Sequence, residues 1–534
     1  MVKGATRMHI SDDGDALNLL DDPLIRVVGA APATLPDLCA RIARGHAVPA
    51  FPALRPHQHH AWHAFLVQLG VVALERAEVE VSGMPHDTGA WRDLLRGLTP
   101  DHPGDEPWRL VVDGMMVPAF MQPPTADGES NYRQRDDTPD DIDILVTSRH
   151  HSIKAGAARR AGPDDWLFAL LTLQTMSGVG GRGLYGVARM NRGNSSRPAF
   201  SLVPAGADFG ACVRRDIVAL AGQSAALHRD SPFSGDAALL WIDPWGGTKS
   251  EALPPSRVHP LAIEICRRIR LRTDDGGGLF AIRASSEAPR IAAADLRGLT
   301  GDPWTPTSTD KALTVSPAAS FQYDHISTLL SSGDWRLPLL CRPTRDEARA
   351  GAQMHLVARA VVRGQGRTDG YRERIIPLRA AAVRALGVAD SDPGIGAIAR
   401  DRVDQVKKVQ AALRSALYTF IASDAGDSSA NFEHVRAWQN RLDEIVEDSF
   451  FDALQTEFEA AEADRSAVRI GWLRVVVDAA TSIFRDAMLG LPHHAARRYR
   501  TRAQAERRFQ QRLRGPSGVP SLYDHEADGE HDAA

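Results

Sequence analysis

The spacing of apolar residues changes once along this chain, close to Pro377. Beyond that point glycine becomes scarce and apolar residues recur every three or four positions, which is the period of an α-helix. Four long helices with short connections predict an antiparallel four-helix bundle over residues 377–514. Two predicted apolar faces support this bundle: Val403, Val406, Leu413, Leu417 and Phe420 on one helix, and Trp472, Val475, Val476, Ala479, Ile483 and Phe484 on another.

The first 376 residues show a different pattern, in which short apolar runs alternate with many glycines and prolines. Helical spacing predicts helices over residues 56–75 and about 164–175, whereas the polar stretch at 123–143 predicts a mobile loop. The chain therefore predicts an α+β protein, with a large mixed N-terminal domain of irregular loops over residues 1–376 followed by the bundle. Residues 515–534 are acidic and predict a disordered tail.

Composition says more about the possible functions of this chain than about its fold. The 534 residues carry a formal net charge of −4, so a nucleic acid would have to be bound by local basic patches on a mildly acidic body. The four cysteines are isolated and form no CxxC pair, which argues against a cysteine-ligated zinc site and favours a reduced, cytoplasmic protein. We expect no membrane association, because no apolar run approaches the roughly 20 residues of a membrane span.

The segment from Ser177 to Pro198 is rich in both glycine and arginine. Glycine lets a backbone approach a groove closely, and arginine contacts phosphates or base edges. Such a loop suits the minor groove of a duplex, although composition alone also allows a flexible surface loop. A nucleotide-binding loop is disfavoured because no GxxxxGK[ST] motif is present. The candidate DNA-binding residues are Gly178, Gly180, Gly181, Arg182, Gly183, Arg189, Asn191 and Arg192.

A second glycine-rich tip lies between Arg363 and Arg374. Its glycines punctuate a short turn that carries hydrogen-bonding side chains, so the tip could enter a base-pair step or read a base edge. A plain hairpin turn explains the same pattern equally well. The candidate wedge residues are Gln365, Arg367, Thr368 and Asp369.

Two histidine clusters contain the residue type that commonly binds metal ions. The adjacent His150 and His151 lie in the segment SRHHSIK, but a metal-dependent nuclease needs several more convergent ligands and a base. A basic loop that touches RNA or DNA is the simpler interpretation. The group from His57 to His63 lacks the glutamate of HExxH and predicts surface histidines at a helix start. No hydrolase or kinase motif is present, so we expect no catalytic residue, metal ligand or cofactor.

Two arginine-rich stretches leave their roles open. The segment CRRIRLR predicts a half-buried strand with Arg268, Arg270 and Arg272 on one face, which either faces nucleic acid or forms an ion-paired edge. The last predicted helix carries eight arginines between Arg497 and Arg514. That face is either solvated or contacts a nucleic-acid strand or an acidic partner.

The order of several segments resembles that of the CasA family, the large subunit of the type I-E CRISPR Cascade surveillance complex. The resemblance covers nearly all of the chain, and it rests on the set rather than on any single piece. The segments are LNLLDDPLIRV at 17–27, HQHHAWHAFLVQL at 57–69, PAFMQPP at 118–124, LVTSRHHSIK at 145–154, the glycine-rich stretch at 178–193, WIDPW at 241–245, HPLAIEICRRIRL at 259–271 and GQGRTDGYRER at 364–374.

The resemblance implies a non-catalytic subunit with four kinds of partner: the CRISPR guide RNA, double-stranded target DNA, the other Cascade subunits and the helicase–nuclease. Such a subunit recognises the protospacer-adjacent motif through the minor groove, promotes duplex unwinding and R-loop formation, and recruits the nuclease. The family's glycine loop maps onto Gly178–Gly183, and its wedge loop maps loosely onto residues 364–370. A loop that contacts the guide and a neighbouring subunit falls near Arg149, His151 and Lys154.

One departure from the family pattern limits what can be carried over. Some members have a cysteine cluster after the central strand, whereas this chain has only Cys266 there, so no zinc site is implied. Two alternatives to the DNA-inspecting role remain at this point. One is a metal-dependent nuclease that uses the histidine cluster at 148–154, and the other is a purely structural scaffold subunit.

Overall fold

The computed structural model describes residues 17–126, 128–145, 161–191, 197–315, 321–331, 333–364, 367–387, 394–421, 428–491 and 498–523. The chain forms two compact units. Unit 1 contains residues 1–320, 336–344 and 354–377, and unit 2 contains residues 321–335, 345–353 and 378–534. Residues 378–534 thus fall in the second unit, and two earlier segments join them.

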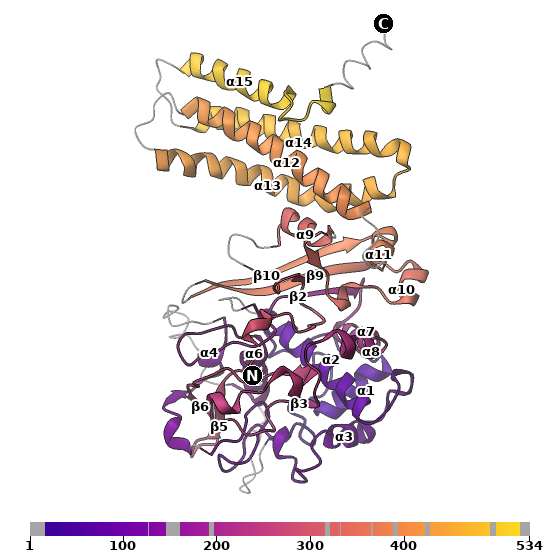
Figure 1. The fold of residues 1–534 in the computed structure, drawn as a ribbon, viewed down its shortest axis with the longest axis vertical. Coiled ribbons are helices and arrows are strands. Elements are labelled where there is room, and N and C mark those ends of the chain that lie inside the picture. Colours follow the sequence, from indigo (N-terminus) through magenta and orange to yellow (C-terminus); the bar gives the residue numbers. More distant parts are fainter. Residues whose placement is uncertain are drawn as a thin grey trace, which may run out of the picture. The chain divides into compact units, whose positions relative to one another are not determined.

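Unit 1 is a mixed α and β structure (Figure 1), and its helices α2 (His59–Arg76) and α6 (Pro163–Met176) are almost fully buried. Its helices are α1 (Leu35–Arg44), α2 (His59–Arg76), α3 (Thr88–Arg96), α4 (Pro139–Ile142), α6 (Pro163–Met176), α7 (Phe209–Ala221) and α8 (Ser224–Asp230). Its strands are β1 (Gln134–Asp136), β2 (Ala199–Pro204), β3 (Ala237–Leu239), β4 (Val258–Ile263), β5 (Arg268–Thr273), β6 (Leu279–Ala284), β7 (Thr307–Ser308), β9 (Met354–Gly364) and β10 (Arg367–Leu378), while β8 (Trp335–Arg336) lies where the units divide.

The sheets of unit 1 are small. One has the strand order β1-β6-β5, another has the order β10-β9-β2, and β3 pairs with β4 in parallel. In the first sheet β5 and β6 are antiparallel, with Ile269 opposite Arg283. In the second, β2 and β9 are antiparallel, with Phe200 opposite Ala358. The expected α+β class is confirmed, and the short strands explain why the sequence shows no long alternating run.

The predicted helix at 56–75 is present as a short 3-10 turn followed by α2, but its histidines are not on the surface. Every residue from His60 to Leu74 is buried, because the helix is apolar on all faces and packs in the core. The Nε2 atom of His57 lies 2.7 Å from Asp143 Oδ1, and His63 Nε2 lies 2.8 Å from Asp216 Oδ2. These histidines bind carboxylates inside the fold, so the surface prediction was wrong.

The stretch at 123–143 was expected to be a mobile loop, and its described residues are instead ordered. It contains a 3-10 turn at Glu129–Asn131, strand β1 and helix α4. Strand β1 pairs with β6, and the Asp136 carboxylate accepts two hydrogen bonds from the Arg283 guanidinium. The polar composition reflects ion pairing across this sheet edge.

Unit 2 contains α9 (Tyr323–Leu330), α10 (Arg345–Ala350), α11 (Ala380–Gly387), α12 (Gly394–Ile421), α13 (Ser428–Glu459), α14 (Glu462–Gly490) and α15 (Arg498–Arg514). The four long helices lie side by side, and α12 contacts each of the other three (Figure 1). The predicted face from Val403 to Phe420 is buried as expected. On α14 the predicted face was shifted, since Val475 is 56% exposed and Val477 and Ala480 face the core instead.

The predicted tail begins later than expected. Residues after Gly515 turn back, with the Val519 backbone N–H donating to the Leu513 carbonyl at 2.8 Å. Val519 and Leu522 are buried, and the Arg514 guanidinium lies 4.8 Å from the centre of the Tyr523 ring. The prediction of disorder from residue 515 is therefore wrong for 515–523. Burial of Val519 and Leu522 offsets the loss of conformational entropy when this segment is ordered. Residues 524–534 lie outside the described part of the chain.

Candidate nucleic-acid interface

Residues 177–191, which follow α6, form what we call the glycine loop. Its tip is a tight turn in which Gly180 N–H donates to the Leu184 carbonyl at 2.8 Å, and Leu184 N–H donates to the Gly181 carbonyl at 3.1 Å. Gly181 has φ +130° and Gly183 has φ +79°, conformations that favour glycine. A Cβ atom on Gly183 would also lie 2.8 Å from the Cβ of Ser285, so this position has no room for a side chain.

The base of the glycine loop is held by Arg267, which lies just before β5. Its Nη2 donates to the Gly178 carbonyl at 2.8 Å, and its Nη1 donates to the Tyr185 carbonyl. Arg267 is itself placed by Gln174 of α6, whose Oε1 accepts the backbone N–H groups of Cys266 and Arg267 at 2.9 and 2.8 Å. The turn is thus fixed from below by hydrogen bonds to its own carbonyl groups.

Arg189 was predicted to contact DNA, and the structure contradicts this. It is 1% exposed, with its Nε 3.0 Å from Glu264 Oε1 and its Nη2 2.9 Å from the Pro260 carbonyl. The other Glu264 oxygen accepts the Ala188 N–H at 2.7 Å. Burial lowers the pKa of Arg189 and raises that of Glu264. Arg189 therefore anchors the end of the loop from inside the fold.

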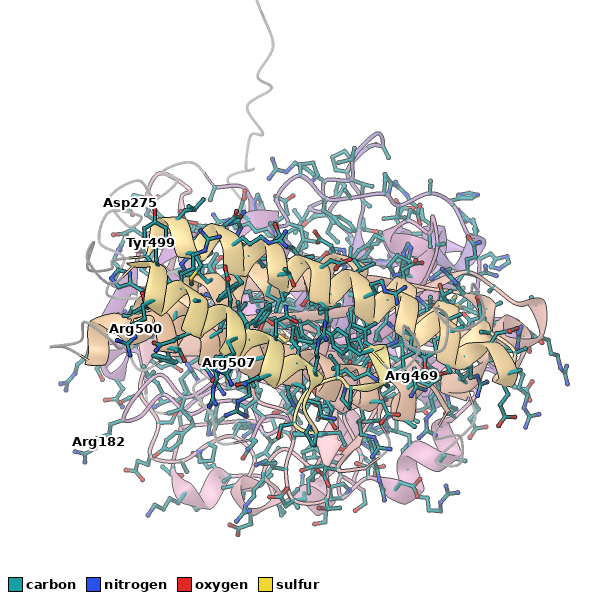
Figure 2. The ribbon with its side chains drawn as sticks, turned by 90° about the horizontal axis from the view of Figure 1, so that it is seen from above. Arg182, Asp275, Arg469, Tyr499, Arg500 and Arg507 are labelled. Atoms are coloured by element: carbon teal, nitrogen blue, oxygen red, sulfur yellow. The ribbon has the colours of Figure 1, made fainter. Side chains whose placement is uncertain are left out.

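The outer part of the glycine loop is a short exposed tip formed by Val179, Gly180, Gly181 and Arg182. The Arg182 side chain extends outward (Figure 2), and within the described part of the chain it forms no hydrogen bond or ion pair. The exposed guanidinium can contact a phosphate or a base edge, and the neighbouring glycines have no side chains that would clash with the walls of a DNA groove. Of the other candidates, Asn191 is half-buried and Arg192 lies outside the described residues.

A cavity of about 300 Å³ lies beneath the tip of the glycine loop. Its lining is mainly apolar and includes Val179, Val187 and Met190 from the loop, with Pro289 and Ile291 opposite. The Tyr185 hydroxyl beside it donates to the Glu287 carbonyl at 2.7 Å. The loop therefore rests on a second segment, residues 285–294, which sequence reasoning did not connect to it.

The predicted wedge tip connects β9 to β10, which are neighbouring strands of one sheet. Gln365 lies outside the described residues, and the side chains of Arg367 and Asp369 do as well. Thr368 is 5% exposed, and its hydroxyl donates to the Ile144 carbonyl at 3.0 Å. Thr368 is therefore part of the packing of unit 1 and is removed from the wedge candidates. The guide-contact candidates Arg149, His151 and Lys154 lie outside the described residues.

The arginine stripe of β5 faces the inside of unit 1, and the ion-paired interpretation holds in part, since Arg272 Nη2 lies 3.7 Å from Glu129 Oε2. Arg270 is 0% exposed, and its guanidinium donates to the carbonyls of Gln122, Gly114 and Val117 at 3.0, 2.7 and 2.7 Å. Arg272 donates to the Val112 carbonyl at 3.1 Å. Desolvation lowers the pKa of Arg270 to about 10. The stripe binds the carbonyl-rich segment 112–125 inside unit 1, a use of arginine that periodicity alone does not reveal.

The arginines of α15 in unit 2 lie on its solvent side. Thr501, Ala505, Phe509 and Leu513 recur every four residues and are buried. Between them, Arg500, Arg502, Arg507, Arg508 and Arg514 are exposed, and Figure 2 shows Arg500 and Arg507 on the outer side of the helix. Of these, Arg502 pairs with Glu506 at 3.0 Å.

The sequence profile of the CRISPR-associated protein Cse1 matches residues 18–483. The chain belongs to the Cse1 family. The resemblance to the CasA family is thereby confirmed, since the two names describe one solved protein, CasA (Cse1) of Thermus thermophilus. No curated protein matches the chain. Within the described residues, no helix has the length and hydropathy needed to cross a membrane.

Solved members of the Cse1 family share the fold over almost the whole chain. The Thermus thermophilus protein is 16% identical, with a TM-score of 0.64 over 93% of this chain and 99% of the other. Cse1 from Acidimicrobium ferrooxidans is 13% identical, with a TM-score of 0.61 over 96% and 99%. Cse1 from Thermobifida fusca is also 13% identical, with a TM-score of 0.57 over 95% and 98%.

Several residues that build the glycine loop were missed by the sequence analysis. Gln174 and Glu264 are polar residues in otherwise apolar runs, LLTLQTM and LAIEIC. A buried polar side chain must find a partner, so such an isolated residue signals a hydrogen-bonding role. The sequence does not reveal which backbone groups they meet, because those partners lie about 75 to 95 residues away.

Proposed function

We propose that this chain is the non-catalytic large subunit of an RNA-guided Cascade complex, and that the tip of its glycine loop inspects duplex DNA. Membership of the Cse1 family supports the role in Cascade. The partners proposed with it are the guide RNA, double-stranded target DNA, the other Cascade subunits and the helicase–nuclease. In this role the subunit recognises the protospacer-adjacent motif, seeds unwinding of the duplex and R-loop formation, and recruits the nuclease.

The observation that carries the DNA-inspecting role is the construction of the glycine loop. Its exposed tip bears a single long side chain, Arg182, beside Gly180 and Gly181, whereas Arg267 and Glu264 hold its base from inside the fold. The minor groove is only about 6 Å wide, so a narrow backbone with one arginine fits where a bulkier loop does not. A narrow minor groove also concentrates negative potential, which attracts arginine.

The net charge of the chain supports a local rather than a general interaction with DNA. With a formal charge of −4 the body of the protein does not attract a duplex by itself. Binding by a few exposed arginines is then weak and strongly dependent on salt. Such contacts suit a subunit that samples many sites briefly and pauses only where the flank fits.

The experiment uses the assembled complex and two duplexes that differ only in the flank. Replacing both tip glycines, with Gly180→Val and Gly181→Val, is expected to abolish the preference for the correct flank, because side chains then fill the space needed by the groove. The nearest neighbours of a Cβ on Gly180 are side-chain atoms of Leu184 and Arg267, whereas a side chain on Gly181 meets no atom within 4 Å but is strained by the φ of +130°. Gly180→Val alone is therefore made as well, to separate the steric effect from backbone strain. Assembly, measured by size-exclusion chromatography, should be unchanged. Flank preference that survives both changes would show that the loop assignment is wrong.

A second variant tests the contribution of the Arg182 charge separately from the steric fit of the loop in the groove. Arg182→Ala removes an exposed guanidinium without disturbing a described contact, so folding should be unaffected. We expect about tenfold weaker binding to both duplexes and a salt slope lower by about 1, as for one lost phosphate contact. The matched control is Arg257→Ala, another exposed arginine of unit 1 outside the loop. Equal losses for the two variants would favour a scaffold role in which the loop does not meet DNA.

A further inference from the structure

A second cluster of chemically reactive side chains lies in unit 1, away from the glycine loop. Glu75 in the last turn of α2, His228 of α8 and His259 of β4 bring one ligand atom each to within 4.8 Å of one another. One imidazole is exposed and the other is buried, while the carboxylate is half-buried. Three segments far apart in sequence thus meet at one point near the surface.

The distances from the Glu75 carboxylate to the two imidazole nitrogens are close to those expected around a bound ion. Glu75 Oε2 lies 3.3 Å from His259 Nε2 and 3.8 Å from His228 Nε2. Ligands at about 2.0–2.2 Å from a tetrahedral zinc ion lie about 3.3–3.5 Å from each other. Only a small movement of the exposed His228 side chain is needed to bring the second distance into that range.

The carboxylate of Glu75 is incompletely satisfied. Its Oε1 accepts a hydrogen bond from the Ser224 hydroxyl, whereas its Oε2 is buried and has no hydrogen-bond partner among the described residues. The His259 Nε2 is close to Oε2, but the pair lacks the alignment of a hydrogen bond. A shared ion requires such an off-axis approach, because the ion lies beside the line between nitrogen and oxygen and not on it.

From these contacts we infer that Glu75, His228 and His259 form a binding site for a divalent zinc-like cation. Two imidazoles and one carboxylate are ligands that suit zinc, and three protein ligands leave a fourth position for water. The site lies on side chains that the proposed DNA-inspecting role does not use. It also contains no cysteine, so it differs in ligand type from the cysteine cluster of some family members.

Binding carries a cost within the cluster. The Nδ1 atom of His259 accepts the Leu261 N–H at 3.1 Å, which places the ring proton on Nε2 in the metal-free protein. An ion at Nε2 requires the ring proton to move to Nδ1, and the hydrogen bond from Leu261 is then lost. Uptake should weaken as the pH falls, because protons compete with the ion for the imidazole nitrogens. An ordinary histidine–carboxylate contact is the competing explanation, and it predicts no uptake at this site.

The test uses the purified full chain without an affinity tag, stripped with a chelator and then dialysed against Zn²⁺. We expect the wild type to retain one more Zn²⁺ per chain than His228→Gln, whose affinity at this site should fall at least tenfold. Because His228 is exposed, that variant should keep the wild-type circular dichroism spectrum and metal-free melting temperature. His434→Gln, which changes an exposed histidine of α13, is the matched control and should bind as the wild type does.

Two further measurements make the outcome unambiguous. Co²⁺ in place of Zn²⁺ should give the visible absorption of a tetrahedral ion with the wild type and not with His228→Gln. Zn²⁺ should raise the melting temperature of the wild type more than that of Glu75→Gln, since binding to the folded state stabilises it. Equal Zn²⁺ content in the wild type and in His228→Gln would overturn the proposal, because any bound ion would then lie elsewhere. Neither outcome bears on DNA inspection.

Discussion

Asp302 shows how a single buried charge is kept ionised in unit 1. Its side chain is 0% exposed and accepts two hydrogen bonds from the Arg197 guanidinium, together with one from the Thr305 hydroxyl at 2.9 Å. Burial alone would raise the pKa of Asp302, but the charge and hydrogen bonds of Arg197 lower it below its ordinary value. The pair therefore stabilises the fold only while the carboxylate is charged.

Asp302→Asn is predicted to destabilise unit 1 by about 3–5 kcal/mol at neutral pH, because Arg197 is left buried without its counter-charge. A carboxylate with a lowered pKa in the folded state contributes stability above its unfolded pKa, near 3.8, and loses that contribution as the pH falls further. The difference in melting temperature between wild type and variant should thus narrow below about pH 4. A difference that stays constant with pH would contradict this account.

At the scale of elements, Arg270 donates three of the hydrogen bonds that tie strand β5 to the segment 112–125. Arg270→Met leaves three buried carbonyls without their donor and is predicted to cost about 3 kcal/mol or more. Arg270→Lys should restore little of this, since a single ammonium cannot reproduce the planar fork that reaches all three. Thermal denaturation measures the loss, with Arg257→Lys as the exposed control. A lysine that fully restores stability would mean that charge, rather than geometry, is what the site requires.

The segment after α15 provides a second test at this scale. Leu522 is 2% exposed, whereas its neighbour Ser521 is exposed. Leu522→Ala should therefore destabilise unit 2 by about 2–4 kcal/mol, the usual range for a buried leucine, while Ser521→Ala should have no measurable effect. Chemical denaturation followed by circular dichroism of the helices distinguishes the two. Equal stability of both variants would restore the expectation of a disordered segment from residue 515.

At the scale of the whole molecule, each unit has its own buried ion pair and its own core. In unit 2, Arg402 Nε donates to Glu457 Oε2 at 2.8 Å, and both side chains are 0% exposed. Two compact units predict two unfolding transitions in calorimetry of the full chain. Glu457→Gln should lower one transition and Asp302→Asn the other, each by several degrees. Both variants lowering a single shared transition would show that the units unfold together.

The sequence alone determined α2, α6, the long helices of unit 2 and the general architecture, because helical periodicity is a local property. Predicting the apolar face from Val403 to Phe420 required only residues within one helix, and predicting the helix around Trp166 in α6 did as well. The order of motifs along the chain also indicated the family, since motif order is written in the sequence itself. The glycine-rich tip from Gly178 to Gly183 was recognised for the same reason.

Only the tertiary structure decided which polar side chains face inward. Arg189 meets Glu264, Thr368 meets the Ile144 carbonyl, and Glu75 meets His259, all between residues far apart in the chain. A sequence shows that an arginine or histidine is present, but its exposure depends on which distant carbonyl or carboxylate the fold brings beside it. The same chemistry therefore supplies buried anchors at Arg189 and Arg270 and an exposed guanidinium at Arg182.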